Sequence, residues 1–189
     1  MAQFVNVPMD TFIFARGVAT SPATGEIFVG TSTGDVLVVR VAQATTPVIT
    51  TALSSHTAPI SCLASSRTEP YLVSADDMGI IVVWALQQDP PVAAAVFTEG
   101  QGFPCTCVAV SGDVIVAGFS TGTLRIYRLS ALELHMEVAA HSRCITALSV
   151  HPSATMMATV SEDTFLHIWP LPSFDSKDVD EVRGTRRNP

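Results

Sequence analysis

The sequence predicts an all-β fold built from four repeated units. Four segments of the chain each contain a short polar or glycine-containing turn followed by a run of β-branched residues, and these runs end at Val39, Trp84, Tyr127 and Trp169. The ends of successive runs lie 45, 43 and 42 residues apart. A period of about 40–45 residues is that of one four-stranded propeller blade. We therefore expect four blades of about 43 residues each.

Each unit contains enough short apolar runs for four strands. The runs before and after the turn predict a β-hairpin, because two apolar segments joined by a short polar turn favour that structure. Residues 132–138 alternate apolar and polar side chains, which is the two-residue period of a strand. The runs before the turns are residues 27–29, 71–73, 114–116 and 156–158; earlier runs lie at 60–64, 107–110 and 145–150, and later ones at 47–53, 92–97 and 132–138.

Composition excludes several classes of protein. The chain has 189 residues, of which 48% are hydrophobic and 14% charged, so disorder over most of its length is excluded. The purely apolar runs, such as residues 92–97, are far shorter than the ~18 residues of a membrane-spanning helix. A net charge of −7 disfavours nucleic-acid binding. The N-terminus has no secretory signal and the four cysteines are too sparse for a disulfide framework, so we expect a cytoplasmic protein.

Two histidines at matching positions indicate a specific repeat family. His56 lies 28 residues before Trp84, and His141 lies 28 residues before Trp169. A serine or threonine lies ten residues before each tryptophan, and Asp163 lies six before Trp169. These spacings resemble the hydrogen-bonded His–Ser/Thr–Asp–Trp tetrad of the WD-repeat β-propeller family. The resemblance implies two structural tetrads, His56, Ser74, Asp77 and Trp84 in the second unit, and His141, Thr159, Asp163 and Trp169 in the fourth.

The second unit departs from the family pattern, and the first and third lack it. Met78 occupies the position six before Trp84, so either Asp77 reaches the tetrad through a turn that is one residue longer, or this tetrad is incomplete. The matching positions cannot form the network in the first unit (Thr11, Val29, Thr33, Val39) or in the third (Glu99, Ala117, Thr121, Tyr127).

Catalytic and metal-binding interpretations find little support. Cys105 and Cys107 form a Cys-x-Cys pair and Cys144 follows His141 by three residues, but no second pair with zinc-ligand spacing exists. No glycine-rich phosphate loop precedes a helical segment. We expect no metal and no cofactor, and we expect the protein not to be an enzyme. A thiol- or metal-dependent hydrolase that uses these four residues is the less favoured alternative.

The resemblance implies a scaffold that binds protein partners. In such propellers the leading residues of the inner strands lie on one rim and contact partners. Carried over to this chain, the candidate rim consists of Pro59, Ser61, Asp76, Pro104, Thr106, Cys144, Thr146 and Glu162. The alternative is a structural subunit of a large cytoskeletal or ciliary assembly.

The expected organisation is a leader or outer strand at residues 1–9, a propeller segment at 10–171, and a polar, disordered tail at 172–189. The family's common ring has seven blades, so four blades form part of a larger propeller, with a small four-bladed ring as the alternative. The faces of the first and fourth units would then lack neighbours. These faces carry apolar residues, so self-association through them is expected; the residues are Val18, Val38, Ile145, Leu148 and Ile168.

Overall fold

The computed structural model describes residues 14–40, 48–151 and 153–174, and these residues are all-β. Fifteen strands are present among them. None of the described residues forms a helix that could cross a membrane. The predicted fold class is therefore confirmed. The expected leader at 1–9 and residues 175–189 of the expected tail lie outside the described residues.

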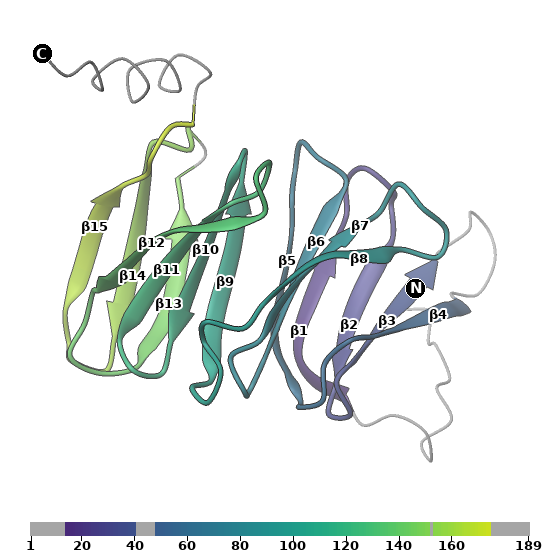
Figure 1. Cartoon of the computed structure of the whole chain (residues 1–189), viewed down its shortest axis with the longest axis horizontal. Coiled ribbons are helices and arrows are strands. Elements are labelled where there is room, and N and C mark those ends of the chain that lie inside the picture. Colours follow the sequence, from purple (N-terminus) through teal and green to yellow (C-terminus); the bar gives the residue numbers. More distant parts are fainter. Residues whose placement is uncertain (1–13, 41–47, 152, 175–189) are drawn as a thin grey trace, which may run out of the picture.

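The strands form four antiparallel sheets, which we call blades 1 to 4 in chain order (Figure 1). Blade 1 contains β1 (Phe14–Thr20), β2 (Ile27–Thr31), β3 (Asp35–Arg40) and β4 (Val48–Ser54). Blade 2 contains β5 (Ile60–Ser65), β6 (Tyr71–Asp76), β7 (Ile81–Ala85) and β8 (Val92–Phe97). Blade 3 contains β9 (Cys105–Ser111), β10 (Val114–Phe119), β11 (Thr123–Arg128) and β12 (Glu133–Ala139). Blade 4 contains β13 (Ile145–Val150), β14 (Met156–Ser161) and β15 (Leu166–Pro170).

The central hairpin has the same register in every blade. The residue that ends each predicted run pairs with an apolar residue of the preceding strand: Val39 with Ile27, Trp84 with Leu72, Tyr127 with Ile115 and Trp169 with Met157. Positions in one blade can therefore be compared with those in another by counting from the turn.

The inner strands β1, β5, β9 and β13 lie side by side in that order. Figure 1 shows blades 1 and 4 at opposite ends of the molecule, so the described residues form an open row of blades. The apolar core lies between blades. One cluster joins blades 1 and 2, another joins blades 2 and 3, and a third joins blades 3 and 4. This is the arrangement expected of repeats that bury their apolar faces only against their neighbours.

The third strand of each blade shows how much this burial depends on a neighbour. Val36 and Val38 of β3 and Ile81 and Val83 of β7 are fully buried against the following blade. The equivalent residues of β15, Leu166 and Ile168, are 60% and 68% exposed. Blade 4 thus presents an apolar face that the described residues leave uncovered.

The expectation about the end faces needs correction. Val38 and Ile145 do not lie on an open end face, because both are fully buried between neighbouring blades. Residues 172–174 of the expected tail are described and have no regular secondary structure. Phe174 packs against the cluster between blades 3 and 4 and contacts the His135 ring edge-on, with ring centres 4.7 Å apart.

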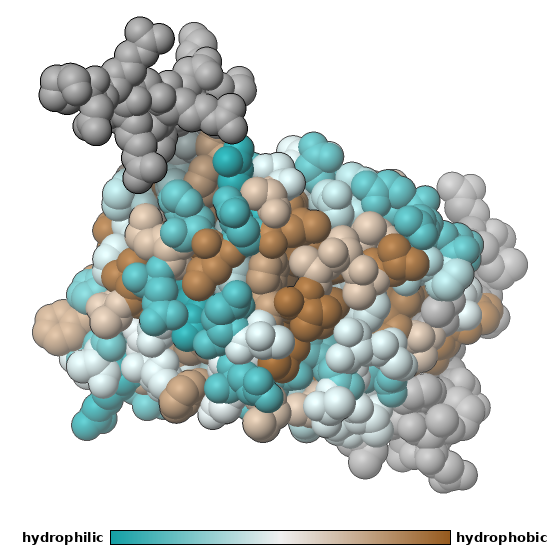
Figure 2. All heavy atoms as spheres, viewed as in Figure 1, coloured by the Kyte–Doolittle hydropathy of each residue, from teal (hydrophilic) through white to brown (hydrophobic). Residues whose placement is uncertain are grey.

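Apolar residues are also exposed on the outer strand of blade 2. Figure 2 shows hydrophobic residues gathered over the middle of this face, where β8 crosses the view in Figure 1. Val92 and Val96 of β8 are 39% and 49% exposed. An outer strand has no further strand to cover its outward face, so partial exposure here follows from its place in the blade.

Candidate functional site

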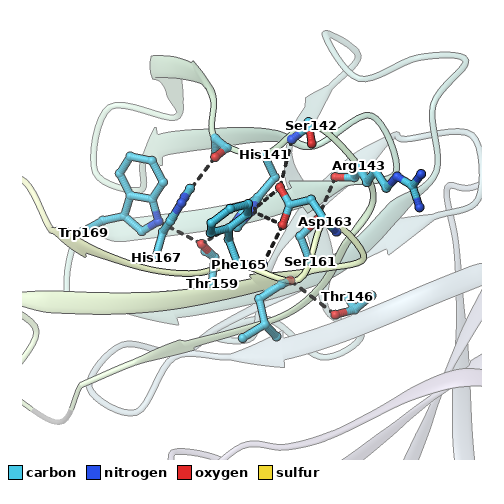
Figure 3. Close-up of polar contacts among 12 residues, drawn as sticks. His141, Ser142, Arg143, Thr146, Thr159, Ser161, Asp163, Phe165, His167 and Trp169 are labelled. Atoms are coloured by element: carbon cyan, nitrogen blue, oxygen red, sulfur yellow. Dashed lines mark hydrogen bonds and ion pairs between the residues drawn. The ribbon is translucent and has the colours of Figure 1, made fainter.

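Blade 4 contains a continuous hydrogen-bond network built around His141 (Figure 3). The Nδ1 of His141 lies 3.0 Å from Oδ2 of Asp163, and its Nε2 lies 2.8 Å from Oγ1 of Thr159. The indole Nε1 of Trp169 donates to the same Oγ1 at 2.8 Å. Because a carboxylate only accepts, Nδ1 carries the proton, and the threonine hydroxyl donates to Nε2. Every polar side-chain group of the four residues is thus hydrogen-bonded within the blade.

The carboxylate of Asp163 also fixes the surrounding backbone. The backbone N–H groups of Ser142 and Phe165 each donate to it at 3.0 Å. Desolvation raises the pKa of Asp163, but these two backbone hydrogen bonds and the contact with His141 outweigh it and lower that pKa to about 2. The charged carboxylate therefore holds the turn after β14 against the loop that precedes β13.

Blade 2 contains the same network with a different aspartate. His56 contacts Oδ2 of Asp76 through Nδ1 at 2.8 Å and Oγ of Ser74 through Nε2 at 2.7 Å. Trp84 donates from Nε1 to Oγ of Ser74 at 2.8 Å. The other oxygen of Asp76 accepts from the backbone N–H groups of Met78 and Ile80, each at 2.9 Å. Asp76 is fully buried.

The prediction that Asp77 completes this network is wrong, because the turn after β6 is no longer than the others. A backbone hydrogen bond from Gly79 to Asp76 closes it, and one from Thr164 to Ser161 closes the equivalent turn of blade 4. Blade 4 supplies its carboxylate from the third turn position, where blade 2 has Met78. Blade 2 supplies it from the first position.

Blades 1 and 3 contain no such network among the described residues. At the position of the tryptophans, blade 3 has Tyr127, whose ring packs against Phe97 with centres 4.4 Å apart. The Tyr127 hydroxyl is buried without a hydrogen-bond partner, and desolvation raises its pKa. In blade 1, the hydroxyl of Thr31 bonds to the backbone of Asp35 instead. Thr11, a predicted position of blade 1, lies outside the described residues.

Backbone hydrogen bonds join turns to preceding loops at one end of the blades, which we call the rim. The second turn residue of blades 2, 3 and 4 donates its backbone N–H, at 3.0 Å in each case, to a carbonyl of the loop before the inner strand. The pairs are Asp77 with Pro59, Ser120 with Pro104, and Glu162 with Cys144. In each of these three blades, the turn after the second strand is thus bonded to the loop before the inner strand of the same blade.

The structure distributes the eight predicted rim residues over three environments. Pro59, Thr146 and Glu162 are exposed, and Pro104, Thr106 and Cys144 are half-buried. The hydroxyl of Thr106 donates to backbone carbonyls of blades 3 and 4, so it joins blades rather than facing solvent. Ser61 and Asp76 are buried. Their placement on an accessible rim is wrong: Ser61 lies beside the blade interface, and Asp76 belongs to the network.

Sequence reasoning missed two exposed rim residues, Met78 and Phe103. Their side chains are 45% and 52% exposed. The two residues lie in neighbouring segments, because the N–H of Gly102 donates to the carbonyl of Met78 at 2.8 Å. The sequence contained one signal for Met78: this methionine occupies the turn position at which blade 4 has Asp163.

The cysteines and histidines do not converge on one centre. Among residues 14–40, 48–151 and 153–174, no group of three or more His, Cys, Asp or Glu side chains could hold a metal ion. Both ring nitrogens of His56 and of His141 are already hydrogen-bonded, and Cys105 is fully buried.

Comparisons with known proteins agree with this geometry. The model of the WDR54 family matches residues 6–185. WD repeat-containing protein 54 of Mus musculus is 34% identical over 181 residues, covering 91% of this chain and 53% of the mouse protein. The Homo sapiens protein of the same name is 33% identical over 165 residues, covering 84% of this chain and 48% of the human protein. The chain therefore spans about half the length of the curated relatives it matches.

Solved structures show the fold. The computationally designed Ika4 protein is similar with a TM-score of 0.75 and 18% identity, over 91% of this chain and all of the designed one. A chain of the mitotic checkpoint complex is similar with a TM-score of 0.69 and 19% identity, over 81% of this chain and 46% of that chain.

Proposed function

The chain belongs to the WDR54 family of WD-repeat proteins, and from that premise we propose that it is a non-enzymatic scaffold that binds protein partners through its rim. The supporting observation is the pair of exposed apolar side chains, Met78 and Phe103, at the junction of blades 2 and 3. Large apolar side chains on loops held by a rigid scaffold are typical of binding surfaces.

The backbone around this pair is rigid, which favours binding because little freedom is lost when a partner docks. The turn that carries Met78 is held by the buried carboxylate of Asp76. The loop that carries Phe103 is closed by hydrogen bonds from Gln101 to Thr98 and from Phe103 to Gly100.

Charge indicates the chemistry of the partner. Glu99 is an exposed acid in the same loop as Phe103, whereas Asp77, next to Met78 in the turn, already forms an ion pair with Arg16 at 3.8 Å. The whole chain carries a net charge of −7. We infer a partner segment that combines an apolar anchor with lysine or arginine, because opposite charges around an apolar contact fix its orientation.

A pull-down from cell extract with the full chain as bait tests the proposal. The double variant Met78→Ser, Phe103→Ser removes the apolar pair and keeps the backbone hydrogen bonds. The control is Met136→Ser, which changes a 40% exposed methionine of the outer strand β12. Partners identified by quantitative mass spectrometry should be lost with the double variant and kept with the control. Equal capture by both variants would place the binding surface elsewhere.

A hydrolase remains the less favoured alternative. Cys105 has no exposed surface, and the pKa of its thiol is raised by its hydrogen bond with Cys62 and by desolvation, so it cannot attack a substrate that arrives from solvent. The cytoplasmic location also stays a prediction.

A structural subunit of a larger assembly is the second candidate, and the uncovered face of blade 4 favours it. Leu166 and Ile168 on this face, and Val18 in blade 1, are more than half exposed. Two copies could cover these faces by pairing end to end. Size-exclusion chromatography with light scattering should then show a species larger than the 20.0 kDa monomer. A monodisperse monomer would contradict self-association.

A further inference from the structure

Two cysteines of neighbouring blades lie in contact. Cys62 is on the inner strand β5 of blade 2, and Cys105 begins the inner strand β9 of blade 3. Their Sγ atoms are 3.9 Å apart, although 43 residues separate them in the chain. Both side chains belong to the apolar cluster between the two blades. The scaffold function described above makes no use of this contact.

The two thiols differ in access to solvent. Cys105 has no exposed surface, whereas Cys62 is half-buried. A small reagent therefore meets Cys62 first.

The two thiols also differ in their readiness to ionise. The hydrogen bond with the Cys105 thiol lowers the pKa of Cys62; the Ser61 hydroxyl and the positive charge of Arg16 act in the same direction, while desolvation and Asp77 oppose them. The other two cysteines lack this support. Desolvation raises the pKa of Cys107 to about 11 and also raises that of Cys144.

We propose that Cys62 and Cys105 form a redox-active dithiol, which hydrogen peroxide converts to a disulfide that links blade 2 to blade 3. Cys62 is the attacking thiol because of its exposure, and Cys105 is the resolving thiol because its sulfur is already in contact.

The reaction balances in two steps. The Cys62 thiolate attacks one oxygen of hydrogen peroxide, the O–O bond breaks, and a sulfenic acid forms with release of hydroxide. The Cys105 sulfur then attacks the sulfenic sulfur, the S–O bond breaks, and hydroxide leaves. The thiol protons convert both hydroxides to water, so two thiols and one peroxide give one disulfide and two waters. A dithiol reductant reverses the reaction by thiol–disulfide exchange.

The disulfide would add a second covalent connection between two blades that are consecutive in the chain and pack against each other. It would close a loop that contains most of blade 2, and constraining the unfolded chain in this way raises stability. We therefore expect the oxidised protein to melt at a higher temperature than the reduced protein.

The test begins with the reduced full chain treated with one equivalent of hydrogen peroxide. The number of free thiols titrated in denaturant should fall from four to two per chain, and dithiothreitol should restore four. Trypsin cleaves after Arg67, so the disulfide should join fragment 41–67 to fragment 68–125 in non-reducing mass spectrometry. A chain that keeps four thiols, or a product that runs as a disulfide-linked dimer, would overturn the proposal.

Matched variants identify the pair, because fragment 68–125 contains both Cys105 and Cys107. Cys62→Ser and Cys105→Ser should each abolish the linked fragments and the rise in melting temperature. Cys107→Ser and Cys144→Ser should keep both. Circular dichroism confirms that each variant is folded. Linked fragments that persist in Cys105→Ser and disappear in Cys107→Ser would assign the bond to Cys107 and contradict the proposed pair.

Discussion

Blades 2 and 4 contain the same four-residue network in different surroundings. Blade 2 has a neighbour on both sides, and its Trp84 is only 3% exposed. Blade 4 packs against blade 3 on one side and has no described neighbour on the other, so Trp169 is only half-buried. The network distances are nevertheless nearly equal. The hairpin and its preceding loop therefore suffice to form the network, whereas burial of the blade depends on the neighbouring blade.

Removing the histidine of each network should give the largest effect and separate the two blades. His56→Ala leaves the fully buried Asp76 carboxylate without its imidazole, and loss of one partner of a buried pair costs about 3–5 kcal/mol of unfolding free energy. His141→Ala should cost less, about 1–3 kcal/mol, because water can reach the open side of blade 4 and replace lost hydrogen bonds. Urea denaturation of both variants measures the two values.

A double-mutant cycle provides the control for this comparison. His141→Ala combined with Asp163→Ala should destabilise by less than the sum of the single changes, since both act on one network. Equal costs for His56→Ala and His141→Ala would show that the neighbouring blade does not matter.

The contact between blades 1 and 2 should be the next most sensitive. A Cβ added to Gly30 would lie 2.5 Å from Cγ2 of Ile60 in the following blade, and one added to Gly118 would lie 2.9 Å from Cγ2 of Ile145. Gly30→Ala should therefore destabilise by about 1–3 kcal/mol through overpacking. Gly118→Ala should act in the same direction and less strongly. Thermal melts compare the two variants with the parent. Unchanged melting temperatures would show that neighbouring blades move apart to accommodate the added Cβ without loss of stability.

Acid should weaken the network of blade 4 only at low pH. The pKa of Asp163 in the folded protein is about 2, below its ordinary value of 3.8, so the charged carboxylate favours the folded state. This contribution is complete above the unfolded pKa and is lost as the pH falls towards 2. The parent should melt higher than Asp163→Asn at pH 6, and the difference should shrink between pH 4 and pH 2. A constant difference over that range would contradict the assignment.

The smallest effect concerns the fourth turn residue. Thr164 has a φ of 72°, where Gly79 of blade 2 has 80°. A β-branched residue is strained at positive φ, so Thr164→Gly should stabilise by about 1 kcal/mol. The reverse type of change in blade 2, Gly79→Ala, should instead destabilise strongly, because the added Cβ would overlap the carbonyl oxygen of Gly100. Thermal melts measure both changes, and destabilisation by Thr164→Gly would show that the threonine side chain makes a contact worth more than the strain.

The local pattern of the sequence determined the blades. The spacing of Val39, Trp84, Tyr127 and Trp169 located the four hairpins, and all four of these residues occupy the same register. The 28-residue spacing also located His56 and His141 correctly within their networks. The first result follows from alternation and turn chemistry, which act over a few residues. The second rests on the resemblance of the spacing to that of the WD-repeat family.

Which carboxylate is hydrogen-bonded to His56, and which rim residues face solvent, depends on the tertiary structure. Asp76 ends β6 and Asp77 follows it in the turn, and the closed turn buries Asp76 completely but leaves Asp77 half-buried. The prediction placed Asp77 in the network and Asp76 on the rim, because the sequence does not show which of two adjacent side chains turns inward; a shift of one residue reverses the face without changing the composition. The contact between Cys62 and Cys105 likewise depends on how neighbouring blades pack, since the interaction joins strands of two blades.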